Sequence, residues 1–151
     1  MSEPKSYSLH SSLGYRLSVA SRLQEKRLEE KLKSLGLTRI YWCILLAVEN
    51  EGLFTPSDIA TFVGIDRTAT SRALKQMEAA GLIQRAQGKE DRRTKRVRAT
   101  EDGRQKIAQA VPFAQENVRL MDVKLTHHEQ SELRRLLAKL LQGERIELSN
   151  F

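Results

Sequence analysis

A short polar-faced helix followed by a basic hairpin is the feature of this sequence that most restricts its fold. Asp66 is a favourable N-cap, and Gly81 can adopt the left-handed conformation that ends a helix. Between them, apolar residues recur every three to four positions and predict one buried stripe of a helix. That stripe contains Ala69, Ala73, Met77 and Ala80. The opposite face is predicted to contain Arg67, Thr68, Thr70, Ser71, Arg72 and Lys75.

The residues after this helix predict a two-stranded ribbon rich in cations. Gln87-Gly88-Lys89 offers a turn between Ile83–Arg85 and Thr94–Arg98, and the second of these segments alternates in polarity. Residues 84–98 carry seven Lys and Arg against two acids, which leaves a net charge of +5. A helix followed by a basic hairpin is typical of a winged helix, and the cations favour contact with phosphate. The alternative is that they only solvate an exposed edge strand.

A second short helix and a tight turn precede the polar-faced helix. Thr55-Pro56-Ser57-Asp58 combines a hydroxyl N-cap, a proline at the first helical position and an acid in the first turn. A helix should therefore run from there to Val63. Gly64-Ile65-Asp66 then forms a three-residue turn, which is the spacing of a helix-turn-helix motif. Further upstream, Thr38 caps a strongly apolar helix that we expect to be buried.

Three longer amphipathic helices flank this unit, and each has an apolar seam. They are expected over residues 8–35, 100–121 and 126–141. Thr100 is expected to cap the second of them, and Thr126-His127-His128-Glu129 is a capping box at the start of the third. Pro112 should interrupt and kink the second of them, because proline removes a helical hydrogen bond. One copy of these helices makes a thin core, so we expect a second copy to intertwine with them as a two-fold dimer. The predicted organisation is residues 1–36 and 101–151 for dimerisation and residues 37–100 for a winged helix-turn-helix lobe.

Composition narrows the class of partner. The 151 residues carry a net charge of +7 and give a pI near 9.8, which favours a polyanion. Within residues 52–104 the excess of cations over acids lies in the hairpin and not on an amphipathic helix. No apolar run could span a bilayer, so we expect double-stranded DNA and not a membrane. Aromatic residues make up only 5% of the chain, which argues against base stacking on an aromatic platform. The first residues lack the apolar core of a signal peptide, so we expect a cytoplasmic protein.

The order of helices, turn and wing, together with four sequence segments, resembles the MarR family of bacterial transcription regulators. The similar segments are LGYRLSVASR, GLTRIYWCILLAV, LFTPSDIATFVGIDRTATSRALKQMEAAGLIQR and DRRTKRVRATEDGR. The most specific pieces are GLIQR and the Asp-x-Arg of the wing, Asp91 and Arg93. The resemblance implies a mainly α winged helix-turn-helix protein with a β-hairpin wing. Its recognition helix would enter the major groove of DNA, and its wing arginine the adjacent minor groove.

This resemblance assigns roles to individual residues. Arg72 is expected to read a base, because a guanidinium matches the two acceptors of guanine. Arg93 is expected to probe the minor groove, with Asp91 orienting it or a neighbouring arginine. Further contacts, mainly to phosphate, are assigned to Arg67, Thr68, Thr70, Ser71, Lys75, Lys89, Arg92 and Arg96. For each of these the alternative is an ordinary solvated surface residue.

A second candidate site is predicted for a small aromatic or anionic effector. Regulators similar to this chain bind such compounds between the dimer helices and the DNA-binding lobe. A cation on an otherwise apolar helix segment could pair there with a ligand carboxylate. The residues assigned to this site are His10, Tyr15, Arg16, Tyr41 and Trp42. The alternative is that the aromatic residues belong to the core.

No cofactor, metal site or catalytic site is expected. The three histidines are scattered, and a single cysteine, Cys43, rules out an internal disulfide and is expected to pack in the core. The sequence lacks a nucleophile-base set, so an enzyme is not expected. It predicts a ligand-responsive repressor that acts as a homodimer on a pseudo-palindromic operator. The alternatives are an effector-independent or architectural DNA-binding protein and a helical protein-protein interaction module.

Overall fold

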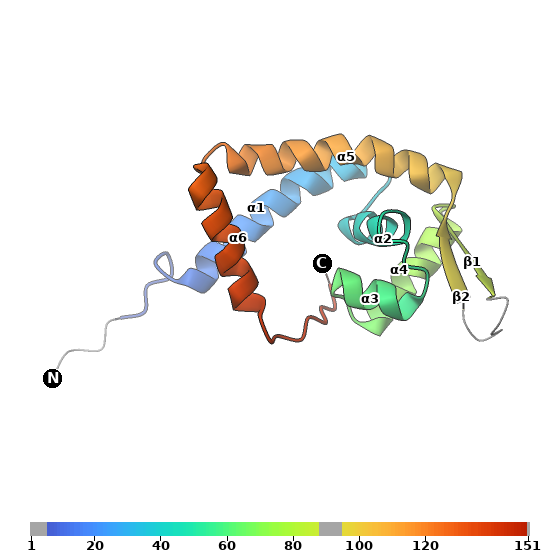
Figure 1. Cartoon of the computed structure of the whole chain (residues 1–151), viewed down its shortest axis with the longest axis horizontal. Helices are drawn as coiled ribbons and strands as arrows, with labels where there is room; N and C mark the ends of the chain where they lie inside the picture. The colour runs from blue at the N-terminus through green and yellow to red at the C-terminus, as the bar shows by residue number, and fades with distance from the viewer. Residues whose placement is uncertain (1–5, 88–94, 151) are drawn as a thin grey trace.

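The computed structural model describes residues 6–87 and 95–150. Within these ranges the chain forms six helices and one two-stranded antiparallel sheet (Figure 1). The elements are α1 (Leu13–Lys33), α2 (Arg39–Glu49), α3 (Pro56–Val63), α4 (Arg67–Ala79), β1 (Ile83–Gln87), β2 (Lys95–Ala99), α5 (Glu101–Asp122) and α6 (His127–Leu141). The predicted fold class, mainly α with a small β-hairpin wing, is confirmed.

A hydroxyl or carboxylate side chain caps the N-terminus of every described helix. Each of these side chains accepts a hydrogen bond from the backbone N–H three residues later, which satisfies a donor that the helix leaves free. The capping residues are Ser12, Thr38, Thr55, Asp66, Thr100 and Thr126. All but Ser12 are predicted from the sequence. At Thr126 the side chain of Glu129 completes the expected capping box.

Helix α1 differs from its predicted extent, and α5 differs from the prediction at Pro112. α1 begins at Leu13 and not at residue 8, because the side chain of Ser12 caps it there. α5 passes through Pro112 without ending, so the predicted interruption is wrong. Proline removes one hydrogen bond of the helix, and the kink expected at Pro112 stays a prediction.

Helix α2 lies at the centre of the hydrophobic core. Ile44, Leu45 and Ala47 are fully buried, as the apolar composition of this helix predicts. Side chains from the other lobe elements and from the neighbouring halves of α1 and α5 pack around them. These side chains are Leu32, Ile59, Leu74, Met77, Ile83, Val97 and Ile107. The core therefore continues across residues 36 and 101 and ties the winged unit to the long helices.

The hairpin attaches to the loop that precedes α3. β1 pairs with β2 from Ile83 opposite Ala99 onward. The Val97 N–H donates a hydrogen bond to the Phe54 carbonyl oxygen at 2.8 Å, which adds an edge contact to the sheet. The predicted turn at residues 87–89 lies mostly outside the described residues.

Helix α6 turns away from the far end of α5, and the segment after it returns to α3 and α4 (Figure 1). None of the α6 residues is buried. Five leucines on this helix are 39% to 54% exposed. They are Leu133, Leu136, Leu137, Leu140 and Leu141. The predicted apolar seam of this helix therefore faces solvent in the single chain.

Candidate nucleic-acid interface

Helix α4 has one buried face and one exposed polar face. The buried face contains Ala69, Thr70, Ala73, Leu74 and Met77, which pack toward the core. On the exposed face, five residues line one open surface depression. They are Arg67, Thr68, Ser71, Arg72 and Lys75. The structure thus brings together five of the six α4 residues that the sequence assigns to DNA.

The sixth residue, Thr70, does not lie on the polar face, and its predicted placement is wrong. It is 2% exposed, and its hydroxyl donates a hydrogen bond to the Asp66 carbonyl oxygen at 2.8 Å. Thr70 precedes the buried Leu74 by one helical turn, so it belongs to the inward stripe. Ala80, expected on that stripe, is exposed because it follows the last residue of the helix.

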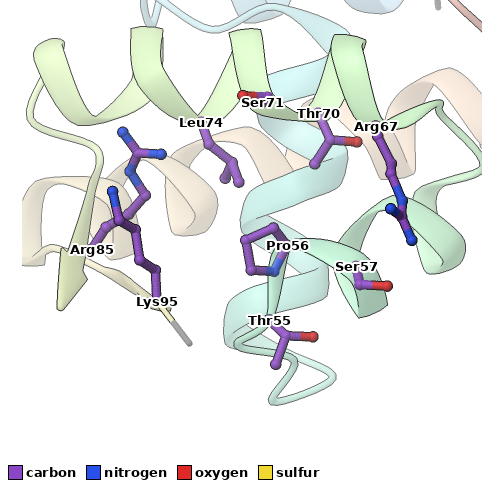
Figure 2. Close-up of a pocket in the computed structure, with 9 residues that line it drawn as sticks. All are labelled: Thr55, Pro56, Ser57, Arg67, Thr70, Ser71, Leu74, Arg85 and Lys95. Atoms are coloured by element: carbon purple, nitrogen blue, oxygen red, sulfur yellow. The ribbon is translucent and has the colours of Figure 1, made fainter. Parts of the chain in front are cut away.

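A cavity of about 560 Å³ opens between the start of α3, helix α4 and the two strands of the wing (Figure 2). Three of its lining side chains are cations, and none is an acid. These cations are Arg67, Arg85 and Lys95. Four hydroxyl-bearing residues, Thr55, Ser57, Thr70 and Ser71, also line it. Cations and hydroxyl donors in one concave site suit an anionic group such as a backbone phosphate.

Arg85 belongs to this cavity, although the sequence does not single it out as a site residue. Its guanidinium lies 3.1 Å from a Glu78 carboxylate oxygen, and its backbone N–H donates to the other oxygen. The hydrogen bond from the Arg85 side chain holds the pKa of Glu78 below its usual range. The pair fixes Arg85 between α4 and β1. Such an arginine is hard to recognise from sequence, because it resembles the other cations of the hairpin.

The wing residues assigned to DNA fall into two groups. Lys89, Asp91, Arg92 and Arg93 lie outside the described residues, so their contacts remain predictions. Arg96 is exposed, and its guanidinium carbon lies 4.7 Å from the centroid of the Phe54 ring. This cation–π contact fixes Arg96 over the loop before α3.

The five residues assigned to an effector lie in two separate places. At the start of α1, the rings of His10 and Tyr15 meet edge to face with centroids 5.1 Å apart, and Arg16 donates to the His10 carbonyl oxygen. On α2, Trp42 is buried in the core, and the Tyr41 hydroxyl donates to Gln76 of α4 at 2.9 Å. Figure 1 shows the start of α1 well apart from α2. One chain therefore does not place all five around one cavity, and their shared role stays a prediction.

Cys43 is half-buried on α2, and burial raises the pKa of its thiol. A protonated, partly buried thiol is a poor nucleophile, which agrees with the predicted packing role. Among the described residues, no three His, Cys, Asp or Glu side chains gather where they could hold a metal ion. Within the same part of the chain, no helix is both long enough and apolar enough to cross a membrane.

Proteins similar to this chain include members of one family of transcription regulators and two HTH-type transcriptional regulators of a bacterium. The model of the MarR family, whose members are regulators and not enzymes, matches residues 35–94. YwhA, an HTH-type transcriptional regulator of Bacillus subtilis (strain 168), is 30% identical over 117 residues, or 78% of this chain and 84% of YwhA. YwoH, a second HTH-type regulator of that strain, is 29% identical over 92 residues, or 61% of this chain and 66% of YwoH.

A solved structure with the same fold contains DNA. The transcriptional repressor CouR bound to a 23-mer DNA duplex has a TM-score of 0.78 and 26% identity. The match covers 93% of this chain and 100% of CouR, a protein of Rhodococcus jostii RHA1. The helix-turn-helix, the hairpin and the similarity to YwhA over most of both chains lead to one conclusion. The chain belongs to the MarR family of winged helix-turn-helix transcription regulators.

Proposed function

We propose that this protein is a ligand-responsive repressor that binds a pseudo-palindromic operator as a homodimer. The observation that carries the proposal is the exposed row of Arg67, Thr68, Ser71, Arg72 and Lys75 on α4, directly opposite its buried face. A helix with this arrangement can lie in the major groove while its other face stays packed on the protein. CouR, solved on a DNA duplex, supports this use of the fold.

The residues of the interface divide into base readers and phosphate contacts. Arg72 lies in the middle of the exposed row and is the candidate for reading guanine. Arg93 is the candidate for the minor groove, with Asp91 proposed to orient it or a neighbouring arginine. Phosphate contacts are proposed for Arg67, Thr68, Ser71, Lys75, Lys89, Arg92 and Arg96. Thr70 does not belong to this group, because its hydroxyl donates a hydrogen bond to the Asp66 carbonyl oxygen.

The exposed apolar seams support the homodimer. The leucines of α6 face solvent together with Leu13, Leu17 and Leu23 of α1. Apolar area of this kind stabilises a protein when it is removed from water, at roughly 25 cal/mol per Å². We infer that a second copy covers it, and that residues 1–36 and 101–151 form the dimerisation region around two lobes of residues 37–100. Two lobes related by a two-fold axis require a pseudo-palindromic site.

We infer that the effector is a small aromatic or anionic compound. CouR has also been solved with p-coumaroyl-CoA, so one protein of this fold binds both DNA and an aromatic, anionic ligand. In this chain Arg16, His10 and Tyr15 form one part of the proposed site, and Tyr41 and Trp42 the other. A ligand would release DNA by favouring a dimer with wrongly spaced recognition helices. We place this regulator in the cytoplasm, where its operator would lie.

Selection of bound duplexes from a random library tests this proposal. The wild-type protein should enrich a pseudo-palindrome whose half-sites lie about one helical turn apart. The affinity for the selected duplex should exceed that for a scrambled duplex by about 10³-fold or more, and both affinities should fall steeply with salt. Enrichment of no sequence, with equal binding to both duplexes, would favour an architectural protein. Binding to neither duplex at low salt would favour a protein-protein interaction module.

A further inference from the structure

The segment that follows α6 returns to the turn of the helix-turn-helix motif and pairs with it. α6 ends near Gly143, which has a φ of +79°. Five residues later, Leu148 forms a parallel backbone bridge with Ile65. The Leu148 N–H donates to the Gly64 carbonyl oxygen, and the Asp66 N–H donates to the Leu148 carbonyl oxygen, both at 2.9 Å. The segment is therefore held by two backbone hydrogen bonds.

A side chain of the segment also packs against this turn. A Cβ atom built on Gly64 would lie 2.8 Å from Cγ2 of Ile146. Gly64 also has a φ of +84°, so both its backbone conformation and the approach of Ile146 favour glycine there. Ile146 and the backbone of Leu148 thus contact the turn, while the side chains of these two residues stay 44% and 49% exposed.

Asp66 joins this contact directly to the recognition helix. Its carboxylate accepts a hydrogen bond from the Ala69 N–H at 2.7 Å and caps α4. Its carbonyl oxygen accepts from both the N–H and the hydroxyl of Thr70. The same residue donates its own N–H to Leu148. A shift of the segment would therefore move the first turn of α4, where Arg67 and Thr68 lie.

The contact is confined to the segment and does not continue the packing of α6. No α6 residue is buried, and no described residue after Asn117 is buried. The backbone bridge thus holds this end of the chain on its own lobe, while the α6 leucines remain available for another surface. The bridge connects the segment after α6 to the start of α4. This connection is additional to the one through the long helices α1 and α5, which pack on α2.

We propose that residues 146–148 act as a tether that positions the recognition helix relative to α6. This inference rests on the proposed role of α4 in reading DNA. The tether holds the N-terminal end of α4, which is the end of the helix away from the wing. A change in the direction of α6 in the dimer would reach Arg67 and Thr68 through two backbone hydrogen bonds, without a rearrangement of the core.

Two substitutions at one position separate the backbone contact from the side chain. Leu148→Pro removes the N–H that is donated to Gly64, whereas Leu148→Ala keeps it. On the duplex selected by the wild-type protein, we expect Leu148→Pro to bind about tenfold more weakly, the order expected for losing one or two backbone hydrogen bonds. Leu148→Ala should bind within about threefold of wild type. Light scattering should show both variants assembled as the wild-type protein is.

Hydrogen exchange of the Asp66 amide supplies the second readout. It should be faster in Leu148→Pro than in Leu148→Ala, because its acceptor is displaced. A chain ending at Gly143 should repeat the loss of affinity, and it should fold because the core lies upstream. Operator binding by Leu148→Pro or by the shortened chain at wild-type strength would overturn the tether, as would unchanged exchange at Asp66. If the wild-type protein selected no duplex, the proposed function would fail first, and the tether with it.

Discussion

The Arg39 guanidinium lies 2.7 Å from a carboxylate oxygen of Glu25 and thereby joins α2 to α1. Arg39 is 7% exposed, and its Nε also lies 3.3 Å from Glu29. Taking a guanidinium out of water is costly, so it stays buried only where acids compensate its charge. The pair connects the helix at the centre of the DNA-binding lobe with a helix whose other end presents an apolar seam.

Arg39→Met should lower the free energy of unfolding by about 1–3 kcal/mol, because the two acids lose the charge that compensates them. The loss should stay below that of a fully buried pair, since Glu25 is 31% and Glu29 52% exposed. Urea unfolding measures it. Arg119→Met is the matched control, because its ion pair with Glu116 lies at the surface and should contribute little. Equal losses in the two variants would contradict the assigned role of Arg39.

The pH dependence of stability should carry a contribution from Glu25. Burial acts to raise the pKa of this carboxyl, but hydrogen bonds from Arg39 and Ser21 outweigh it and hold the pKa below its usual range. The folded pKa is thus lower than the unfolded one, so the ionised group stabilises the fold at neutral pH. That stabilisation is lost as the pH falls through the folded pKa. Unfolding curves give the difference in free energy of unfolding between wild type and Glu25→Gln. This difference should shrink as the pH falls from 7 to about 3. A difference that grows as the pH falls would contradict the prediction.

Gly103→Ala should destabilise the protein, although glycine-to-alanine changes in helices normally stabilise by about 0.5–1 kcal/mol. A Cβ atom at Gly103 would lie 2.3 Å from the backbone carbonyl oxygen of Leu82. That oxygen also accepts the Thr100 N–H, so it is not free to move. Gly14→Ala is the control, because its nearest contact would be the Ser12 hydroxyl at 3.8 Å. Thermal unfolding should shift down for Gly103→Ala and up for Gly14→Ala; upward shifts in both would disprove the close contact.

Leu137→Glu should convert the proposed dimer to monomer, because it places a charge in the exposed seam of α6. Lys139→Glu introduces the same carboxylate on this helix but outside the leucine seam, and it should leave the assembly intact. Light scattering would report about twice the chain mass of 17.2 kDa for wild type and about that mass for Leu137→Glu. A monomeric wild-type protein would refute the two-fold arrangement.

Local features of the fold were predictable from the sequence. An N-cap acts on backbone groups two or three residues away, so Thr55, Asp66 and Thr126 could be assigned without tertiary information. The same holds for Gly81, whose φ of +75° follows the end of α4 as expected. The exposed row on α4 followed from the helical period, except at Thr70, where a polar residue lies on the buried stripe.

Contacts between distant residues were not predictable. The bridge between Ile65 and Leu148 joins backbone atoms of residues far apart in the sequence, and its side chains carry no pattern that indicates pairing. The pairing of Arg39 with Glu25 depends equally on how α1 crosses α2. At Pro112 the local signal predicted an interruption, but the helix continues from Glu101 to Asp122.

The central claim is that Arg72 reads a base while the other cations mainly hold phosphate. The most direct test compares the affinity of Arg72 variants for the selected operator and for a scrambled duplex. Arg72→Ala should cost about 1–3 kcal/mol on the operator and little on the scrambled duplex. Arg72→Lys, which keeps the charge but loses the guanidinium fork, should lose nearly as much on the operator. Lys89→Ala, the phosphate control, should weaken both complexes alike. Equal losses on the two duplexes for Arg72→Ala would contradict the account.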